Sequence, residues 1–255
     1  MITFSEAQLM AWLSPLLWPF LRVLAVFSAA PIFSNRSFPV RARIGLALLV
    51  TVAAQPTLPP MPVVALDDAA VLGVVVQQLG IGLAIGFVVR LVFAAFELAG
   101  EVVGFQMGLN FAAFFDPSLN AQTSAAARFF GYMAALLFVA LNGHLLVLLA
   151  VTRSFEVYPV TQDFSEALRL MKLYTLGGEL FANALWIALP MVALLLFTNL
   201  ALGIISRVAP QMNIYAVGFP VTLAVGLVGM MATLPMLERP FEALLERSIA
   251  LFSGG

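Results

Sequence analysis

The sequence contains no cysteine and a single histidine, His144, among its 255 residues. Without cysteine there is no disulfide, no thiolate nucleophile and no cysteine-ligated metal. One histidine cannot form a histidine metal cluster within a single chain. Charged residues are also scarce, at 10% of the chain, against about 25% in soluble proteins. The net charge is −1 and no basic patch occurs, which argues against a nucleic-acid partner.

Hydrophobic residues make up 62% of the chain, and most of them fall in long runs. This composition predicts an all-α integral membrane protein with about six long apolar helices. The runs are Ala7–Phe33, Ile44–Gln55, Ala69–Leu98, Ala125–Val151, Leu180–Ile205 and Ile214–Leu237. Their lengths are unequal, so we expect some of them to be hairpins that pack against other subunits rather than lipid.

A stripe of glycines and charges marks the segment from Gly82 to Gly108. On one continuous helix, at about 100° per residue, its members fall in a sector roughly 100° wide. They are Gly82, Gly86, Arg90, Phe93, Glu97, Gly100, Glu101, Gly104 and Gly108. Small residues allow another helix to approach closely or to hinge. Charges in an apolar segment must face protein or water. The stripe is therefore predicted to be buried against a partner or a passage.

An unusual density of aromatic residues follows this helix. Met107, Phe111, Phe114 and Phe115 lead into Asp116-Pro117. Proline disfavours a helical conformation at the preceding residue, so the helix should end at or before this step. Two interpretations are open. The rings form a hydrophobic plug in a passage, or the segment is a re-entrant turn buried in a membrane-protein core.

No set of residues in the sequence predicts a reaction or a cofactor site. The GIGLAIG run at Gly80–Gly86 lacks the Lys-Ser/Thr step of a phosphate-binding loop. We therefore expect no enzymatic activity and no cofactor. Arg22 is a cation deep in an apolar run with no partner visible in the sequence. It is either a charge relay or substrate contact, or a structural cation that is bound to a backbone carbonyl or snorkels to an interface. His144 is either a proton carrier or a hydrogen-bonded helix contact.

The tail carries a helical pattern of apolar and acidic residues. Leu237, Phe241, Leu244, Leu245 and Phe252 are interspersed with Glu238, Glu242, Glu246 and Arg247. The pattern predicts an amphipathic helix that lies at the membrane interface or docks on a partner.

Three runs together resemble the FliR family of export-gate subunits in flagellar type III secretion. They are FDPSLNAQTS at Phe115–Ser124, NGHLLVLLAVTRSFEVYP at Asn142–Pro159 and APQMNIYAVGFP at Ala209–Pro220. The resemblance covers essentially the whole chain. Its signature residues are Asn142, Gly143, His144, Pro210, Gln211, Met212, Asn213, Gly218 and Pro220.

The resemblance implies a single family domain over residues 1–255, with a FliP-like part to about residue 180 and a FliQ-like part from about 181. It implies helical hairpins in a helical oligomer with one such chain per complex. Partners would be FliP and FliQ homologues, then FlhB and FlhA homologues, with unfolded export substrates and membrane lipid. The location would be the bacterial inner membrane, as a multi-pass protein of the flagellar basal body.

The resemblance also maps a plug loop onto about Gln106–Thr123, and this favours the plug interpretation. The sequence then predicts a subunit of a protein-export channel whose pore is gated by a hydrophobic plug. Two other functions stay open. One is a proton-coupled transporter of a small solute, with Arg90, Glu97, Glu101 and His144 as a relay. The other is a non-conducting assembly scaffold.

Overall fold

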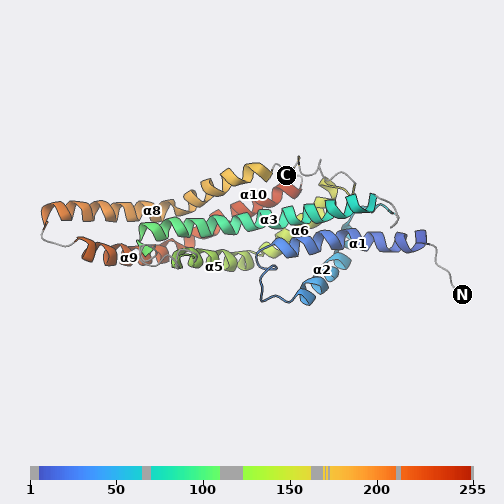
Figure 1. Ribbon diagram of the computed structural model, residues 1–255, viewed down its shortest axis with the longest axis horizontal. Helices are drawn as coiled ribbons and strands as arrows, with labels where there is room; N and C mark the ends of the chain where they lie inside the picture. The colour runs from blue at the N-terminus through green and yellow to red at the C-terminus, as the bar shows by residue number, and fades with distance from the viewer. Residues whose placement is uncertain are drawn as a thin grey trace. The chain divides into compact units, whose positions relative to one another are not determined.

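The computed structural model describes residues 6–64, 70–109, 123–161, 169, 171, 173–210 and 214–253. Most of these residues lie in helices, and no strand occurs among them (Figure 1). The helices are α1 (Glu6–Ala29), α2 (Val40–Ala54), α3 (Ala70–Gln106), α5 (Ala125–Ala140), α6 (Gly143–Val157), α8 (Leu176–Val208), α9 (Ile214–Thr233) and α10 (Glu238–Ser253). The all-α prediction is confirmed.

Four of the described helices are long and apolar enough to cross a membrane, or up to five if the bent pair α5 and α6 counts as one span. The expected number of about six was too high for the part of the chain that is described. The helix α2 has only 15 residues, where a span needs about 20. The run expected over Ala125–Val151 is not one helix, because it is interrupted between Ala140 and Gly143.

The interruption between α5 and α6 is centred on Asn142. This residue has a φ of 55° and stands in the left-handed region. Asparagine tolerates this conformation far better than most other non-glycine residues do. The helix α5 ends at the preceding turn, where the Leu141 N–H still donates to the Leu137 carbonyl at 2.8 Å. The Asn-Gly step is therefore the local cause of the break.

The described chain separates into two compact units. Unit 1 comprises residues 1–91, 142–176 and 245–255, and unit 2 comprises residues 92–141 and 177–244. Both α3 and α10 contribute to each unit. This division differs from the predicted boundary near residue 180. The predicted boundary separates a FliP-like part from a FliQ-like part. The two compact units do not test it, so it stays a prediction.

Close packing of α1 on α3 builds unit 1. A Cβ added at Gly82 would lie 2.7 Å from the Ala25 Cβ, and one added at Gly86 would lie 2.5 Å from the Ala29 Cβ. Any side chain at these positions would push α1 away. In an apolar environment, where burial of apolar surface drives little association, such contacts are a main source of helix attachment.

Unit 2 contains α5, α8, α9 and the second part of α3. A Cβ added at Gly100 would lie 2.5 Å from the Ala127 Cα, so the start of α5 lies directly on α3. The helices α8 and α9 run side by side (Figure 1), and a Cβ added at Gly229 would meet Leu194 and Met191 of α8.

The tail forms the predicted helix, α10, but its apolar side packs on the chain itself. Phe241 is fully buried in unit 2, with ring centroids 5.4 Å from Phe96 and 6.1 Å from Phe93. Phe252 is buried in unit 1 beside the Tyr158 ring. The expectation of a free interfacial or docking helix was therefore wrong, because the apolar stripe is already covered.

The α1–α3 contact at Gly82 makes a stability prediction. Gly82→Ala should lower the free energy of unfolding by about 1–3 kcal/mol, because the added methyl must displace α1. Gly203→Ala in α8, where nothing lies within 4 Å, should instead be neutral or raise it by about 1 kcal/mol through helix propensity. Thermal unfolding of both variants in detergent checks this. Equal stability of the two variants would contradict the described packing.

Candidate functional site

Arg22 of α1 is fully buried within unit 1, in the middle of a candidate span. Each of its three guanidinium nitrogens donates one hydrogen bond. Nε donates to the Gln78 Oε1 at 2.8 Å, Nη1 to the Ser154 Oγ at 2.9 Å, and Nη2 to the Tyr158 carbonyl oxygen at 2.9 Å. The carbon Cζ lies 3.7 Å from the centroid of the Phe155 ring. No carboxylate belongs to this set.

Two glutamines of α3 extend the Arg22 contacts across unit 1. The Gln78 amide donates to the Gln77 Oε1 at 2.9 Å. The Gln77 amide in turn donates to the Thr161 Oγ1 at 2.8 Å and to the Pro159 carbonyl at 3.1 Å. The Thr161 N–H returns a bond of 2.9 Å to Gln77. We call Arg22, Gln77, Gln78, Ser154 and Thr161, with the Tyr158 carbonyl, the Arg22 network. It joins α1, α3 and the end of α6.

Sequence reasoning singled out Arg22 and allowed for a backbone carbonyl, but it missed both side-chain partners and did not identify which carbonyl. The acceptors are neutral, and Ser154 and Tyr158 lie more than 130 positions away. A buried cation is favoured by such hydrogen bonds and by an aromatic face even where no anion is present. The interpretation of Arg22 as a structural cation agrees with this environment, since each guanidinium nitrogen donates to a group of this chain.

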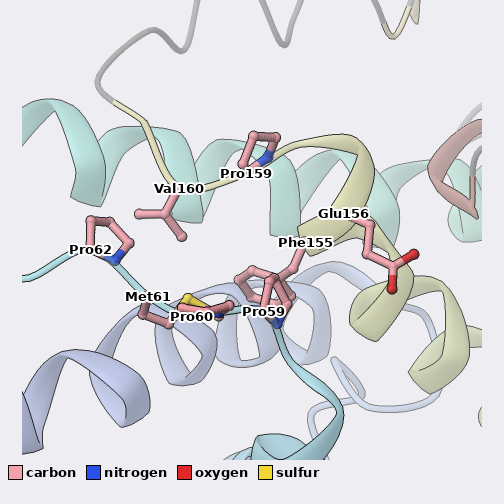
Figure 2. A pocket seen from close by; sticks show the side chains of 8 residues that line it. All are labelled: Pro59, Pro60, Met61, Pro62, Phe155, Glu156, Pro159 and Val160. Carbon is pink, nitrogen blue, oxygen red and sulfur yellow. The ribbon is translucent and has the colours of Figure 1, made fainter.

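A pocket of about 400 Å³ lies beside this network, between the proline-rich segment after α2 and the end of α6. Figure 2 shows its lining side chains, which are Pro59, Pro60, Met61, Pro62, Phe155, Glu156, Pro159 and Val160. Trp18 fastens the proline-rich wall by donating to the Pro62 carbonyl at 3.2 Å. Glu156 is the one charged lining residue, so the pocket offers no convergent polar groups for a ligand.

Tyr158 joins the end of α6 to α10 within unit 1. Its hydroxyl donates to the Leu251 carbonyl at 3.2 Å. Burial raises the pKa of this phenol above its ordinary value, because the phenolate would be poorly solvated. The hydroxyl therefore stays protonated and keeps donating at all physiological pH values.

The second polar contact lies in unit 2, at the end of α3. Glu101 is half-buried, and its Oε1 accepts a bond of 2.9 Å from the Ser124 N–H. Ser124 is the N-cap of α5, and its Oγ accepts from the Ala127 N–H at 3.1 Å. A Cβ added at Gly104 would lie 3.1 Å from that same Oγ. The start of α5 is therefore held against α3 by packing and by a charged hydrogen bond.

Met107 and Gly108 form the described end of α3 and rest on α9. Met107 is fully buried, and a Cβ added at Gly226 would lie 2.6 Å from its Cε. The Thr222 hydroxyl lies 3.4 Å from the Met107 carbonyl oxygen, and its nearer acceptors are the Phe219 and Gly218 carbonyls of its own helix at 3.0 and 3.1 Å. In unit 2, Met107 thus packs among the chain's own helices, whereas the sequence placed it in the plug.

Gly108 departs from the expected continuous helix. Its φ is +77°, which places it in the left-handed region, and its N–H donates to the Phe105 carbonyl at 3.1 Å. The helix α3 ends at Gln106, so Gly108 follows it as the left-handed glycine that commonly terminates helices. It does not continue the helical stripe, although a Cβ added there would lie 3.2 Å from the Phe219 ring.

The predicted charge stripe is not buried by this chain alone. Arg90 and Glu97 are exposed and Glu101 is half-buried. A stripe buried against another chain or a passage stays a prediction. Phe111, Phe114, Phe115, Asp116 and Pro117 lie outside the described residues, as do Gln211, Met212 and Asn213 of the family signature.

The remaining signature residues have structural positions. Asn142 makes the break before α6, Gly143 is buried beside it and His144 is half-buried. Gly218 and Pro220 lie within α9. Pro210 is exposed just after α8. Among the described residues no group of three or more metal-ligating side chains comes together.

The fold and these contacts define an all-α, multi-pass membrane protein whose internal polar groups serve to hold its helices. The chain belongs to the bacterial export proteins, family 1, whose family model matches residues 13–248. It is 42% identical over 241 residues to the flagellar biosynthetic protein FliR of Escherichia coli (strain K12), covering 94% of this chain and 92% of the relative.

Other relatives extend the likeness. The chain is 40% identical to the FliR of Pectobacterium carotovorum subsp. carotovorum, with the same coverage, and 32% identical over 212 residues to the FliR of Bacillus subtilis (strain 168), covering 82% of each chain. The protein is therefore a subunit of the flagellar export apparatus, a multi-pass inner-membrane protein of the basal body. The family resemblance drawn from the sequence is confirmed.

The Arg22 network makes a second stability prediction. Arg22→Met should lower the free energy of unfolding by about 3 kcal/mol or more, because it leaves buried acceptors without donors. Arg22→Lys should restore little of this, since a compact ammonium cannot reproduce the planar fork. Thermal unfolding in detergent measures both, with Arg41→Met on exposed α2 as the matched control. If Arg22→Met unfolded at the same temperature as the Arg41→Met control, the Arg22 network would not stabilise the fold.

Proposed function

We propose that this chain is one subunit of an export gate in the inner membrane. It assembles, as one copy per complex, with FliP and FliQ homologues, and FlhB and FlhA homologues lie next to the assembly. Unfolded flagellar proteins pass through the shared channel. The chain contributes a hydrophobic plug and performs no reaction of its own. Family membership over residues 13–248 is the observation that carries this proposal.

The length of two helices supports an assembly with other chains. The helix α3 has 37 residues and α8 has 33, which correspond to about 55 Å and 50 Å. The hydrocarbon core of a bilayer is only about 30 Å thick. Part of each apolar helix must therefore be covered by something other than lipid tails. Trp186 and Phe197 of α8 are 70% and 73% exposed, so this chain does not cover them.

The proposed plug rests on residues 111–117 of the sequence. Phe111, Phe114 and Phe115 follow Met107 in the sequence, and Met107, just after α3, packs on Gly226 of α9. An apolar constriction can block ions and water by dewetting while it is closed. Gly100 and Gly104 allow close packing beside that constriction.

Two rival functions differ from this proposal in what they require. A small-solute transporter would need Arg90, Glu97, Glu101 and His144 to act as a relay, and Arg90 and Glu97 are exposed in the single chain. A scaffold would need the assembly but no seal. Both rivals predict normal ion permeability when the aromatic segment is removed.

The assembly is tested by co-expression with FliP and FliQ homologues. We expect a stable complex that contains one copy of this chain, because the exposed faces of α8 and α9 require covering. Native mass spectrometry of the purified complex gives the copy number. A chain that purifies as a stable monomer, with its partners present but unbound, would contradict the proposal.

The plug is tested by deletion of Phe111–Ser118 in cells that assemble the apparatus. We expect a raised ion leak with the complex still assembled, because the constriction is lost. Membrane conductance, normalised to the amount of purified complex, is the measurement. A transporter predicts lost uptake without a leak, and a scaffold predicts unchanged permeability. Either outcome would replace the gate as the function.

A further inference from the structure

We propose that α2 and the turn before it form a binding surface for one anionic phospholipid. Arg36 and Arg41 contact its phosphate, and the exposed apolar side chains of α2 contact its acyl chains. The surface lies in unit 1 and shares no residue with the Arg22 network. It requires a chain in the inner membrane and makes no use of the gate proposed above.

Charge of one sign gathers at the start of α2. Residues 7–66 include no aspartate and no glutamate. The arginines of this stretch other than the buried Arg22 lie in the turn after α1 or in the first turn of α2, and they are Arg36, Arg41 and Arg43. The sequence around them therefore supplies positive charge without a neighbouring carboxylate to balance it.

The turn between α1 and α2 has a defined conformation. The Phe33 ring stacks on the Phe27 ring with centroids 4.5 Å apart. The Arg43 Nε donates to the Phe33 carbonyl oxygen at 3.1 Å. The Asn35 Oδ1 accepts from the Ser37 N–H at 3.0 Å. These contacts fix the backbone on both sides of Arg36 and up to the first turn of α2.

Arg36 and Arg41 differ from Arg22 in exposure and in partners. Both are exposed, whereas Arg22 is fully buried. Among the residues that the structure describes, neither side chain has a hydrogen-bond acceptor or an ion-pair partner. A guanidinium presents its N–H donors in a planar fork that fits the oxygens of a phosphate. Two such groups at the start of an apolar helix suit the phosphate of a phospholipid.

The side of α2 that does not pack on α1 is apolar beyond its first turn. Thr51 is the one polar residue after Arg43, and it is buried with its hydroxyl donating to the Ala47 carbonyl at 2.8 Å. Several large side chains of α2 are 43% to 69% exposed, namely Ile44, Leu48, Leu49 and Val52. The exposed part of this helix therefore offers hydrocarbon and no hydrogen-bonding side chain after the arginines.

One face of α2 has the same order of polarity as a phospholipid. At about 100° per residue, Arg41, Leu48 and Val52 fall in a sector about 40° wide. The arginine begins this face and the apolar side chains continue it, as a phosphate is followed by acyl chains. A net negative headgroup is attracted by the arginines, whereas a zwitterionic headgroup carries its own cation. The surface therefore favours an anionic phospholipid.

The test is lipid binding by the full chain, purified and delipidated in detergent. Dioleoyl phosphatidylglycerol is titrated, and native mass spectrometry gives the fraction of chains that carry it. Arg36→Gln/Arg41→Gln removes both charges, and Arg36→Lys/Arg41→Lys keeps the charge without the planar fork. Arg207→Gln/Arg239→Gln removes two exposed arginines of α8 and α10 and is the matched control.

We expect the glutamine variant Arg36→Gln/Arg41→Gln to bind phosphatidylglycerol about 30-fold more weakly, because each arginine beside an anionic lipid contributes about 1 kcal/mol. The lysine variant should bind with an affinity between those of the glutamine variant and the wild type. The matched control should bind like the wild type. Dioleoyl phosphatidylcholine should bind the wild type at least tenfold more weakly than phosphatidylglycerol does. Inorganic phosphate, which has no acyl chain, should not displace the lipid.

Equal phosphatidylglycerol binding by the wild type and the glutamine variant would overturn the proposal, as would equal binding of the two lipids by the wild type. Displacement by inorganic phosphate would also overturn it, because the surface would then be a simple anion site. Thermal unfolding in lipid-free detergent should be the same for all variants. A lower unfolding temperature of the glutamine variant alone would give the two arginines a structural role instead.

A protein occupant of the same surface is tested in the complete export apparatus. If the glutamine variant fails to assemble and the matched control assembles, α2 contacts another subunit and the lipid proposal is wrong. Normal assembly of both variants is the expected result. None of these results changes the ion leak expected from the Phe111–Ser118 deletion, so the lipid surface and the gate can fail separately.

Discussion

Close backbone contact along one face of α3 is the constraint on which both units of this protein depend. In unit 1, Gly82 brings α1 onto α3, and Gln78, one turn earlier, then receives the Arg22 guanidinium. In unit 2, Gly100 brings α5 onto α3, and the adjacent Glu101 receives the Ser124 N–H. In both units a glycine allows the two helices to approach closely, and a nearby polar side chain of α3 then forms a hydrogen bond across the contact. Small residues thus determine where polar bonds can form between helices.

The two polar contacts solve the problem of a buried charge in different ways. Arg22 is fully buried and directs its donors at neutral oxygens and at the Phe155 ring. A carboxylate partner would have required a second ion to lose its solvation, at a cost of several kcal/mol. Glu101 is only half-buried and bonds a backbone N–H at a helix start. Peptide dipoles take the place of a cation there, so neither contact needs an oppositely charged residue in a chain with few charges.

The helices α8 and α9 expose large apolar side chains in the single chain. Within unit 2 these helices contact each other through Gly229, Leu194 and Met191. Residues such as Phe197 and Val228 remain exposed. Large exposed apolar side chains that lie together on an isolated chain mark a lipid or protein interface. Since α8 is longer than a bilayer is thick, lipid alone cannot cover it. The unpartnered surface is thus consistent with a subunit whose fold is completed by others.

Much of this fold could be predicted from the sequence, because its signals are local. The long apolar runs predicted the positions of most helices. The spacing of the glycines predicted which face of α3 is closely packed. The helix end at Gly108 was misjudged, since a left-handed glycine and a packing glycine look alike in a sequence. The tail was misjudged because an amphipathic stripe does not reveal what covers it, and Phe241 is covered by Phe93 and Phe96.

The contacts of the candidate site could not be predicted in the same way. Arg22 had no visible partner because its acceptors are a distant serine, a glutamine and a backbone carbonyl, residue types that occur everywhere. Glu101 appeared to be one charge in a stripe. Its bond to Ser124 depends on α5 starting over Gly100, which only the three-dimensional arrangement reveals. A search for opposite charges at helical spacing misses both contacts, because the acceptors of Arg22 and the Ser124 N–H that bonds Glu101 are all neutral groups.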